Sequence, residues 1–320
     1  MGIFLRLAAC VSCLLTVATA SAQTYPTRPL RMIVPLNAGS GGDVAARFYA
    51  DAASRALGQT IIVDNKPGAA GNIGAAAAAQ AQPDGYTIAW GTNATHASNL
   101  ALFDSIGYDP VKDFEPIAGL AEFPVLLLGR KGLAAGSVKE IMDISKAKPR
   151  TFSLGLPSGT ARVIFELIKE AYPGVDFVGV PYKGEDVSLT DMLGGRLDLT
   201  LVTTPVAKPR VERNELNGLA ITTGKRSPVM PAIATFVEQG GAAVVLSPWA
   251  AVWGPKGTPA QAIQVLNTAF NKSQSDPKVM EFLQNVGAVA MPGTPAELAR
   301  FQKSEIEKWG RIIRKAGIKG

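Results

Sequence analysis

The chain has very few of the residues that supply thiol chemistry or hold metals. Its 320 residues include two cysteines, Cys10 and Cys13, and one histidine, His96. Both cysteines lie in an N-terminal segment that we expect to be removed, so the mature chain would have no disulfide, no thiol and no cysteine-ligated metal. A lone histidine without cysteine also argues against a zinc site. The fold must therefore hold by packing alone, which 47% hydrophobic residues in a chain of this length allow.

Signals for nucleotide binding and for membrane spans are also lacking. In the segment 218–225, five residues rather than four separate the two glycines, and Arg226 follows the lysine where Ser or Thr should stand. After the N-terminal segment, the nearest approach to a membrane span is 242–253. Pro248 interrupts this stretch, which is shorter than the roughly 18 apolar residues that a span needs.

Positive charge is in mild excess, with a formal net charge of +6. Such an excess suits an anionic ligand without proving one. The densest basic segments, 208–213 and 311–319, are mixed with apolar or acidic residues and lack aromatics on which bases could stack. We expect solvated helix faces there and no nucleic-acid partner.

The first 22 residues have the pattern of a secretory signal peptide. Arg6 precedes an apolar run at 7–18, and the small residues 20–22 precede Gln23. The string ending at Cys10 resembles a lipoprotein acylation box, but the apolar segment before it is too short. We therefore expect export and cleavage near Ala22/Gln23.

A glycine loop between a strand and a helix is the clearest candidate site. An apolar strand is expected at 31–35 and a helix at 44–57. Backbone N–H groups in such a turn, together with the positive end of the helix, form an anion cradle. An acidic residue at the helix start would cap N–H groups and hold the loop rather than touch an anion, which it would repel. The predicted cradle residues are Asn37, Ala38, Gly39, Ser40, Gly41, Gly42 and Asp43.

Alternation of short apolar runs with longer amphipathic runs predicts an α/β fold in two lobes. Strands are expected in the first lobe at 31–35, 60–64 and 87–91, and in the second at 124–129, 151–154, 177–181, 197–202 and 219–222. Three helices opening near proline are expected at 259–271, 277–286 and 295–315. The apolar stretches 124–129 and 244–253 would be paired crossings between the lobes. We expect lobe 1 to comprise 23–125 and 245–320, and lobe 2 to comprise 126–244.

Ligands of open parallel sheets bind beyond the carboxyl ends of strands. The loop after the strand at 87–91 carries Thr92, Asn93, Ala94 and Thr95, so it should lie beside the cradle. A second glycine-rich turn at 65–74 follows the strand at 60–64, and we interpret it as structural.

Seven strings spread along the chain carry a family resemblance. They are YPTRPLR (25–31), NKPGAAGNIG (65–74), PDGYT (83–87), YDPVKDF (108–114), VPYKG (180–184), GGRLD (194–198) and KRSP (225–228). In this order and spacing, they make the chain resemble the Bug-type solute receptors of tripartite tricarboxylate transporters. The resemblance covers essentially the whole mature chain.

The resemblance implies a type II periplasmic binding protein, whose two lobes close on a ligand like a Venus flytrap. It implies a mono-, di- or tricarboxylate ligand, either aromatic or aliphatic, no cofactor, and delivery to the permease subunits of a tripartite transporter. Backbone amides and ordered water in lobe 1 would hold one carboxylate. We expect a monomer. Contacts expected from lobe 2 are Ser158, Gly159, Thr160, Arg162, Thr203 and Thr204.

Two departures from the family pattern bear on the ligand. Family members commonly read Pro-Gly-Gly-Ser/Thr-x-Asp at the first loop, whereas here a glycine and a serine have exchanged places, at Ser40 and Gly41. Arg162 stands where histidine is common, and it could either grip a second carboxylate or face outward and pair with Glu166. Val202 supplies no charge for a ligand ammonium group, which disfavours amino acids.

Aromatic side chains could line the predicted site. Trp249 and Phe165 could offer a wall for a ring-bearing acid, although large aromatics more often belong to the core. Val202 itself is also more simply interpreted as a core strand residue.

Two alternative functions remain open from the sequence. Ser40 between strand and helix could be the nucleophile of an exported serine hydrolase. Only His96 could activate it, and His96 lies too early in the chain for an α/β hydrolase. A ligand sensor would use the same cleft as a transport receptor and would differ only in the partner that recognises it.

Overall fold

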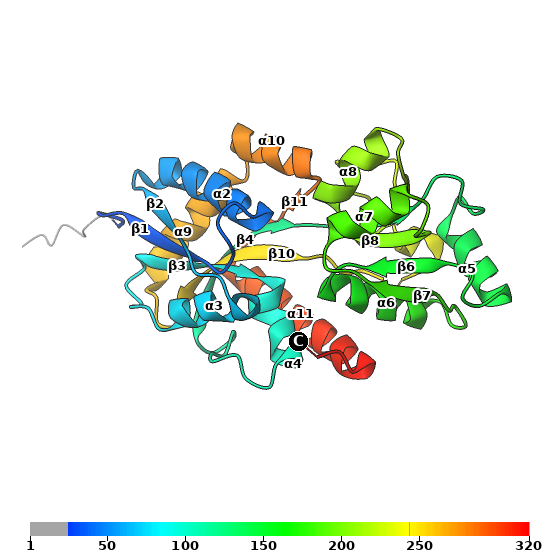
Figure 1. Ribbon diagram of the computed structural model, residues 1–320. Coiled ribbons are helices and arrows are strands. Elements are labelled where there is room, and N and C mark those ends of the chain that lie inside the picture. Colours follow the sequence, from blue (N-terminus) through cyan, green and yellow to red (C-terminus); the bar gives the residue numbers. More distant parts are fainter. Residues whose placement is uncertain (1–24, 243, 320) are drawn as a thin grey trace, which may run out of the picture.

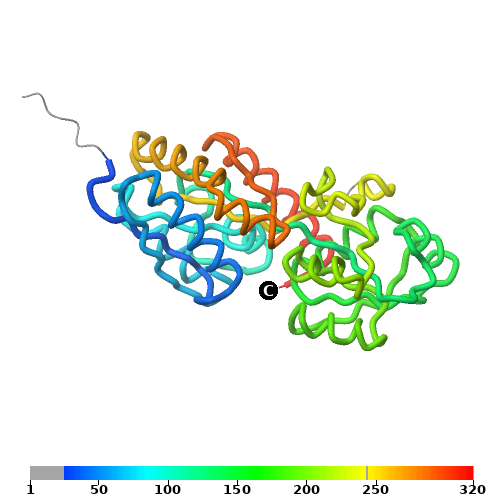
Figure 2. The backbone as a smooth tube through the Cα atoms, turned by 90° about the horizontal axis from the view of Figure 1, so that it is seen from above, coloured from blue at the N-terminus to red at the C-terminus, as the bar shows by residue number. Residues whose placement is uncertain are grey.

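The computed structural model describes residues 25–242 and 244–319, which form two lobes side by side (Figures 1 and 2). The predicted signal peptide, its cleavage site, Cys10 and Cys13 lie outside the described residues. Each lobe is built on one mixed sheet flanked by helices. Among the described residues, no helix is long and apolar enough to cross a membrane.

The sheet of lobe 1 has six strands in the order β11-β4-β10-β3-β1-β2. They are β1 (Leu30–Val34), β2 (Ile61–Asn65), β3 (Thr87–Thr92), β4 (Phe114–Glu122), β10 (Trp249–Pro255) and β11 (Val289–Ala290). The first three strands run parallel, and β10 pairs antiparallel with β3 and β4. The buried faces of β1 and β10 read as nearly continuous apolar runs because helices cover both sides of this sheet.

The sheet of lobe 2 has five strands in the order β7-β6-β8-β5-β9. They are β5 (Val125–Gly129), β6 (Ser153–Leu156), β7 (Val178–Pro181), β8 (Leu199–Thr203) and β9 (Asn217–Ile221). Strands β6, β7 and β8 run parallel, and β5 runs antiparallel to β8.

Helices surround the sheets, and short 3-10 or π turns complete the elements. Lobe 1 carries α2 (Gly41–Leu57), α3 (Asn72–Ala79), α4 (Asn99–Leu102), α9 (Ala260–Ser273) and α10 (Pro277–Val286), with η1 (Ala69–Gly71) and η2 (Ala94–Ser98). Lobe 2 carries α5 (Val138–Ala147), α6 (Gly159–Ala171), α7 (Glu185–Leu193), α8 (Thr204–Glu212) and η3 (Val237–Gln239). The C-terminal helix α11 (Pro295–Ala316) packs on η2 and β4 of lobe 1 and on α6 of lobe 2.

The chain crosses between the lobes twice near one another. It leaves lobe 1 between β4 and β5, and it returns before β10, whose first residue Trp249 pairs with Glu122 at the end of β4. Thr203 at the end of β8 pairs with Val125 at the start of β5, so the carboxyl ends of the parallel strands in lobe 2 point back to lobe 1. Thr92 at the end of β3 pairs with Ala250, so the corresponding edge of lobe 1 also faces the crossings. The two edges where ligands bind in parallel sheets therefore face each other.

The structure corrects three details of the expected elements. Strand β4 (Phe114–Glu122) was not predicted, because Pro116 interrupts its sequence pattern. Helix α2 begins at Gly41 rather than at position 44. The stretch 244–248 forms no strand, and only the second part of the apolar segment enters the sheet, as β10.

Candidate functional site

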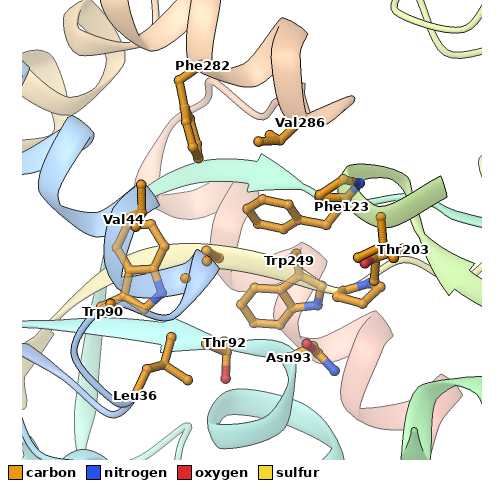
Figure 3. A pocket seen from close by; sticks show the side chains of 17 residues that line it. Leu36, Val44, Trp90, Thr92, Asn93, Phe123, Thr203, Trp249, Phe282 and Val286 are labelled. Carbon is orange, nitrogen blue, oxygen red and sulfur yellow. The ribbon is translucent and has the colours of Figure 1, made fainter. Parts of the chain in front are cut away.

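A cavity of about 490 Å³ opens between the two lobes beside the crossings (Figure 3). Its walls come from the glycine loop and α2, the end of β3, both crossings, the start of α8 and the last turns of α10. None of the 17 residues that line it carries a charge. A ligand here would touch both lobes at once. Of the predicted site residues, those that line the cavity are Gly39, Gly41, Gly42, Thr92, Asn93 and Thr203.

The glycine loop ends in a capped helix whose first amides remain free. Gly39 adopts φ +79°, a left-handed conformation that favours glycine, and Ser40 follows as the N-cap of α2. The Ser40 Oγ accepts a hydrogen bond of 3.4 Å from the Asp43 amide. The amides of Gly41 and Gly42 have no hydrogen-bond partner in the described part of the chain, as expected at the first helical positions. Both glycines line the cavity, so two N–H donors at the positive end of a 17-residue helix adjoin it.

Asp43 holds this loop from inside and does not line the cavity. Its carboxylate is 1% exposed and accepts hydrogen bonds from the Gly39 amide at 2.8 Å, Arg47 Nε at 3.0 Å and Asn65 Nδ2 at 2.8 Å. Burial disfavours its charge, but these hydrogen bonds outweigh burial and lower the pKa of Asp43 below its usual value. The expectation that Asp43 shapes the loop agrees with these contacts. The residue at the N-cap position is Ser40, and the backbone N–H that Asp43 caps is that of Gly39.

The other predicted residues of this loop do not line the cavity. Asn37 accepts a backbone hydrogen bond of 3.1 Å from the Ser40 amide, which closes the turn, and Ala38 lies exposed beside it. The Ser40 hydroxyl accepts the N-cap hydrogen bond from the Asp43 amide. Leu36, which the sequence did not single out, lines the cavity instead.

The loop after β3 supplies Thr92 and Asn93 to the cavity, whereas Thr95 is buried behind them. Thr95 is 1% exposed, and its Oγ1 accepts from the Thr92 amide at 3.0 Å and contacts Nδ1 of His96 at 2.9 Å. The Asn93 side chain makes no hydrogen bond to any described residue, so its amide is available to a ligand. Thr95 therefore orders the loop.

In lobe 2, the two predicted threonines, Thr203 and Thr204, already donate hydrogen bonds within the protein. Thr203 donates from its Oγ1 to Glu185 Oε2 at 2.8 Å and from its amide to Glu185 Oε1 at 3.0 Å. Burial raises the pKa of Glu185 above its usual value, although these two hydrogen bonds act in the opposite direction. Thr204 is fully buried and donates to the Pro124 carbonyl at 2.7 Å, which fastens α8 to the first crossing.

The predicted residues at the start of α6 lie away from the cavity. Ser158 caps this helix by accepting from the Ala161 amide at 3.1 Å, and Gly159 and Thr160 form its first turn. Arg162 is exposed, and its guanidinium forms no ion pair with any residue in 25–242 or 244–319. The alternative pairing with Glu166 is wrong, because Glu166 pairs with Lys169 at 2.6 Å.

Aromatic and aliphatic side chains make up most of the cavity wall. Trp249 lines it, as the sequence suggested, and its indole donates to Glu305 on α11 at 3.1 Å. Phe165 does not line it and packs toward Phe177 instead. Val202 is fully buried in the core of lobe 2. Sequence reasoning missed the other large apolar wall residues, which are Leu36, Val44, Trp90, Phe123, Phe282 and Val286.

The second glycine-rich turn, 65–74, has a structural role and does not line the cavity. A side-chain Cβ at Gly74 would lie 2.6 Å from the Lys66 carbonyl oxygen and 2.9 Å from Pro35 Cα. This close approach lets α3 pack directly on the end of β1.

Features required by a hydrolase or a metal site are not assembled here. His96 is 1% exposed and stacks on Trp253 at 4.6 Å, and its Nε2 has no hydrogen-bond partner among the described residues. Burial lowers the pKa of His96 from 6.5 to about 3. Ser40 therefore has no hydrogen bond to the one histidine that could activate it. Within the described ranges, no group of three or more His, Cys, Asp or Glu side chains could hold a metal ion.

Comparison with known proteins identifies relatives of the whole chain. Residues 45–318 match the family model described as the tripartite tricarboxylate transporter family receptor. Protein BugT of Bordetella pertussis is 34% identical over 305 residues, which cover 94% of this chain and 93% of BugT.

Solved structures share this fold at similar identity. R. palustris Rpa4515 with adipate is 34% identical with a TM-score of 0.76, and the match covers 92% of this chain and 99% of that one. MatC from Rhodopseudomonas palustris with bound malate is 29% identical with a TM-score of 0.71, over 90% of this chain and 100% of that one. The chain therefore belongs to the receptor family of tripartite tricarboxylate transporters and is a periplasmic binding protein with a two-lobed α/β fold.

Proposed function

We propose that this receptor captures a small organic carboxylate in the interlobe cavity and delivers it to the permease of a tripartite transporter. The observation that carries the proposal is the pair of free amides at Gly41 and Gly42, which adjoin the cavity at the start of α2. Two N–H donors at a helix N-terminus bind a carboxylate without a charged side chain. The adipate and malate of the two related structures are ligands of this kind.

Closure of the lobes would complete the site. The chain would be exported, cleaved near Ala22/Gln23, and act as a periplasmic monomer with lobe 1 at 23–125 plus 245–320 and lobe 2 at 126–244. Both lobes already contribute to the cavity wall, so a ligand bound to lobe 1 gains contacts as lobe 2 approaches. In the closed form, Ser158, Gly159 and Thr160 would approach the ligand from lobe 2.

We assign the protein no catalytic role. The Ser40 hydroxyl serves as the helix cap, and His96 is buried in neutral form beneath the loop. A carboxylate held by fixed amides, with no nucleophile aimed at it, is bound and released unchanged.

A proline at position 41 tests the amide contact directly. Gly41 is the first residue of α2, where proline fits the helix and only the free N–H is lost. A Cβ at this position meets nothing within 4 Å, and Ser40, at φ −69° and ψ 158°, has the extended backbone that precedes proline. Gly41→Ala is the matched control, since it adds a Cβ but keeps the N–H.

The measurement is a thermal-shift screen of carboxylic acids and their neutral amides, followed by calorimetry of the best acid. We expect acids alone to raise the Tm, Gly41→Ala to bind like the wild type, and Gly41→Pro to bind about tenfold more weakly, since hydrogen bonds to a charged group are at stake. The proposal fails if sugars or amides stabilise the protein while acids do not.

A further inference from the structure

We infer that the preferred ligand carries a single carboxylate on an apolar body, aromatic or aliphatic, and that a second carboxylate on that body is rejected. This inference rests on the proposed function and narrows its ligand class. The cavity has most of its anion-binding groups at one end, and its other end is mostly apolar and backed by acidic residues.

The free donors gather on the lobe 1 side. The amides of Gly41 and Gly42 adjoin the cavity there, together with the unengaged amide of Asn93. Trp90 stands on the same side, with its indole nitrogen toward the cavity interior in Figure 3. These groups suffice for the two oxygens of one carboxylate.

The opposite wall offers a second carboxylate one main-chain donor, the Val206 amide, and no side-chain donor. The N–H and the O–H of Thr203 both donate hydrogen bonds to Glu185, as described above. The next residue that lines the cavity is Pro205, which lacks an N–H. Val206 follows with an apolar side chain, and only its amide, in the first turn of α8, has no partner among the described residues. A carboxylate placed there would lose its water and gain at most this one hydrogen bond for its two oxygens.

Acidic groups behind the walls oppose a second negative charge. Glu185 lies behind Thr203, and Glu305 lies behind the indole of Trp249. Glu122, at the end of β4, adjoins the cavity residue Phe123, and burial together with the nearby Glu305 raises its pKa above the usual value. Lys308 offsets part of this charge through its ion pair with Glu305, but it also contacts the Val245 carbonyl and does not line the cavity.

The rest of the wall suits an apolar body. Trp249 and Phe123 stand at the crossings, and Phe282 and Val286 of α10 face them across the cavity (Figure 3). Large aromatic faces contribute binding through burial and through specific ring contacts. An apolar chain or ring that extends from the amides of α2 would be enclosed by these side chains.

Matched acids separate this inference from the proposed function. Calorimetry of the mature protein with hexanoate, adipate and hexanamide compares one body with one, two or no carboxylates. We expect hexanoate to bind at least about tenfold more tightly than adipate, and hexanamide to bind more weakly than hexanoate. Equal or tighter binding of adipate overturns the inference but leaves the proposed function intact. Binding of hexanamide as tight as that of hexanoate contradicts the proposed function itself.

Two variants test the cause of the selectivity. Val206→Arg places a cation on the apolar wall and should improve adipate binding relative to hexanoate by at least about tenfold. Val237→Arg, at an exposed position of lobe 2 outside the cavity, is the matched control and should change neither affinity. Arg162→Ala should also leave both affinities within about twofold of the wild type. A selective loss of adipate binding in Arg162→Ala would show that Arg162 reaches a second carboxylate and would overturn the inference.

Discussion

The indole N–H of Trp249 donates a hydrogen bond of 3.1 Å to Oε2 of Glu305, a carboxylate that is only 2% exposed. Trp249 begins β10 at the second crossing and lines the cavity, whereas Glu305 lies on α11, the helix that touches both lobes. The same oxygen of Glu305 also accepts from the indole of Trp309 at 2.9 Å. This one buried carboxylate thus fixes the orientation of Trp249 in the cavity wall and joins it to α11, which packs on both lobes.

Removal of this carboxylate should destabilise the protein and weaken ligand binding together. We expect Glu305→Ala to lower the free energy of unfolding by about 3 kcal/mol, because two buried indole N–H groups lose their acceptor. Glu305→Gln should cost about half as much, since its amide oxygen can still accept. Urea unfolding and calorimetry measure both effects, and Glu307→Ala on an exposed part of the same helix is the control. Unchanged ligand affinity in a folded Glu305→Ala protein would refute the link between Glu305 and the cavity.

Asp43 should contribute stability that depends on pH. Its hydrogen bonds lower its pKa in the folded state below the usual value of 3.8. Its stabilising contribution is therefore fully present above that value and is lost as the pH falls through the lower, folded-state pKa. We expect Asp43→Asn to lose about 2 kcal/mol at pH 7, and its deficit relative to the wild type to shrink below pH about 4.

Asp51→Asn is the control for Asp43. Asp51 lies on the same helix, and its side chain is 61% exposed in an ion pair with Arg55. Its loss should change stability by no more than about 0.5 kcal/mol. Equal effects of the two substitutions would show that Asp43 does not hold the loop.

His96 should remain neutral in the folded protein throughout the physiological pH range. Burial lowers its pKa to about 3, so between pH 6.5 and 3 the unfolded chain binds a proton that the folded chain does not. Stability should therefore decrease as the pH falls below 6.5, with a contribution from His96 of about 1.4 kcal/mol per pH unit. Because His96 is the sole histidine, its imidazole C2–H gives a single NMR resonance. That resonance should not shift between pH 8 and 5, and a titration midpoint near 6.5 would contradict the burial described here.

Ser40 should stabilise helix α2 as its N-cap and should take no part in hydrolysis. We expect Ser40→Ala to lower stability by about 1 kcal/mol through loss of the N-cap. Neither the wild type nor the variant should hydrolyse an activated ester such as p-nitrophenyl butyrate. Hydrolysis by the wild type that disappears in Ser40→Ala would instead support a serine hydrolase.

The sequence was most informative where local spacing determines structure. A strand, a glycine turn and a helix in succession predicted the loop from Asn37 to Asp43, and the free amides of Gly41 and Gly42 lie within it. Because ligands bind beyond the carboxyl ends of parallel strands, the sequence also predicted that Thr92 lies beside this loop. Local pattern did not show that α2 begins at Gly41, and so it did not identify Ser40 as the N-cap residue.

The apolar wall was harder to predict because it depends on tertiary packing. Phe123, Phe282 and Val286 come from segments far apart in the chain, and each is indistinguishable from a core residue in the sequence. The engagement of Thr203 by Glu185 was hidden for the same reason, since α7 and β8 meet only in the folded lobe. Thr203, which the sequence predicted to contact the ligand, therefore has its N–H and its O–H already bonded to Glu185.

A crystal structure of the protein with the tightest-binding acid of the panel tests the central claim most directly. We predict that a carboxylate oxygen lies within hydrogen-bonding distance of the Gly41 and Gly42 amides, with the body of the acid against Trp249 and Phe123. An acid bound outside the interlobe cavity, or one whose carboxylate contacts neither amide, would contradict the account.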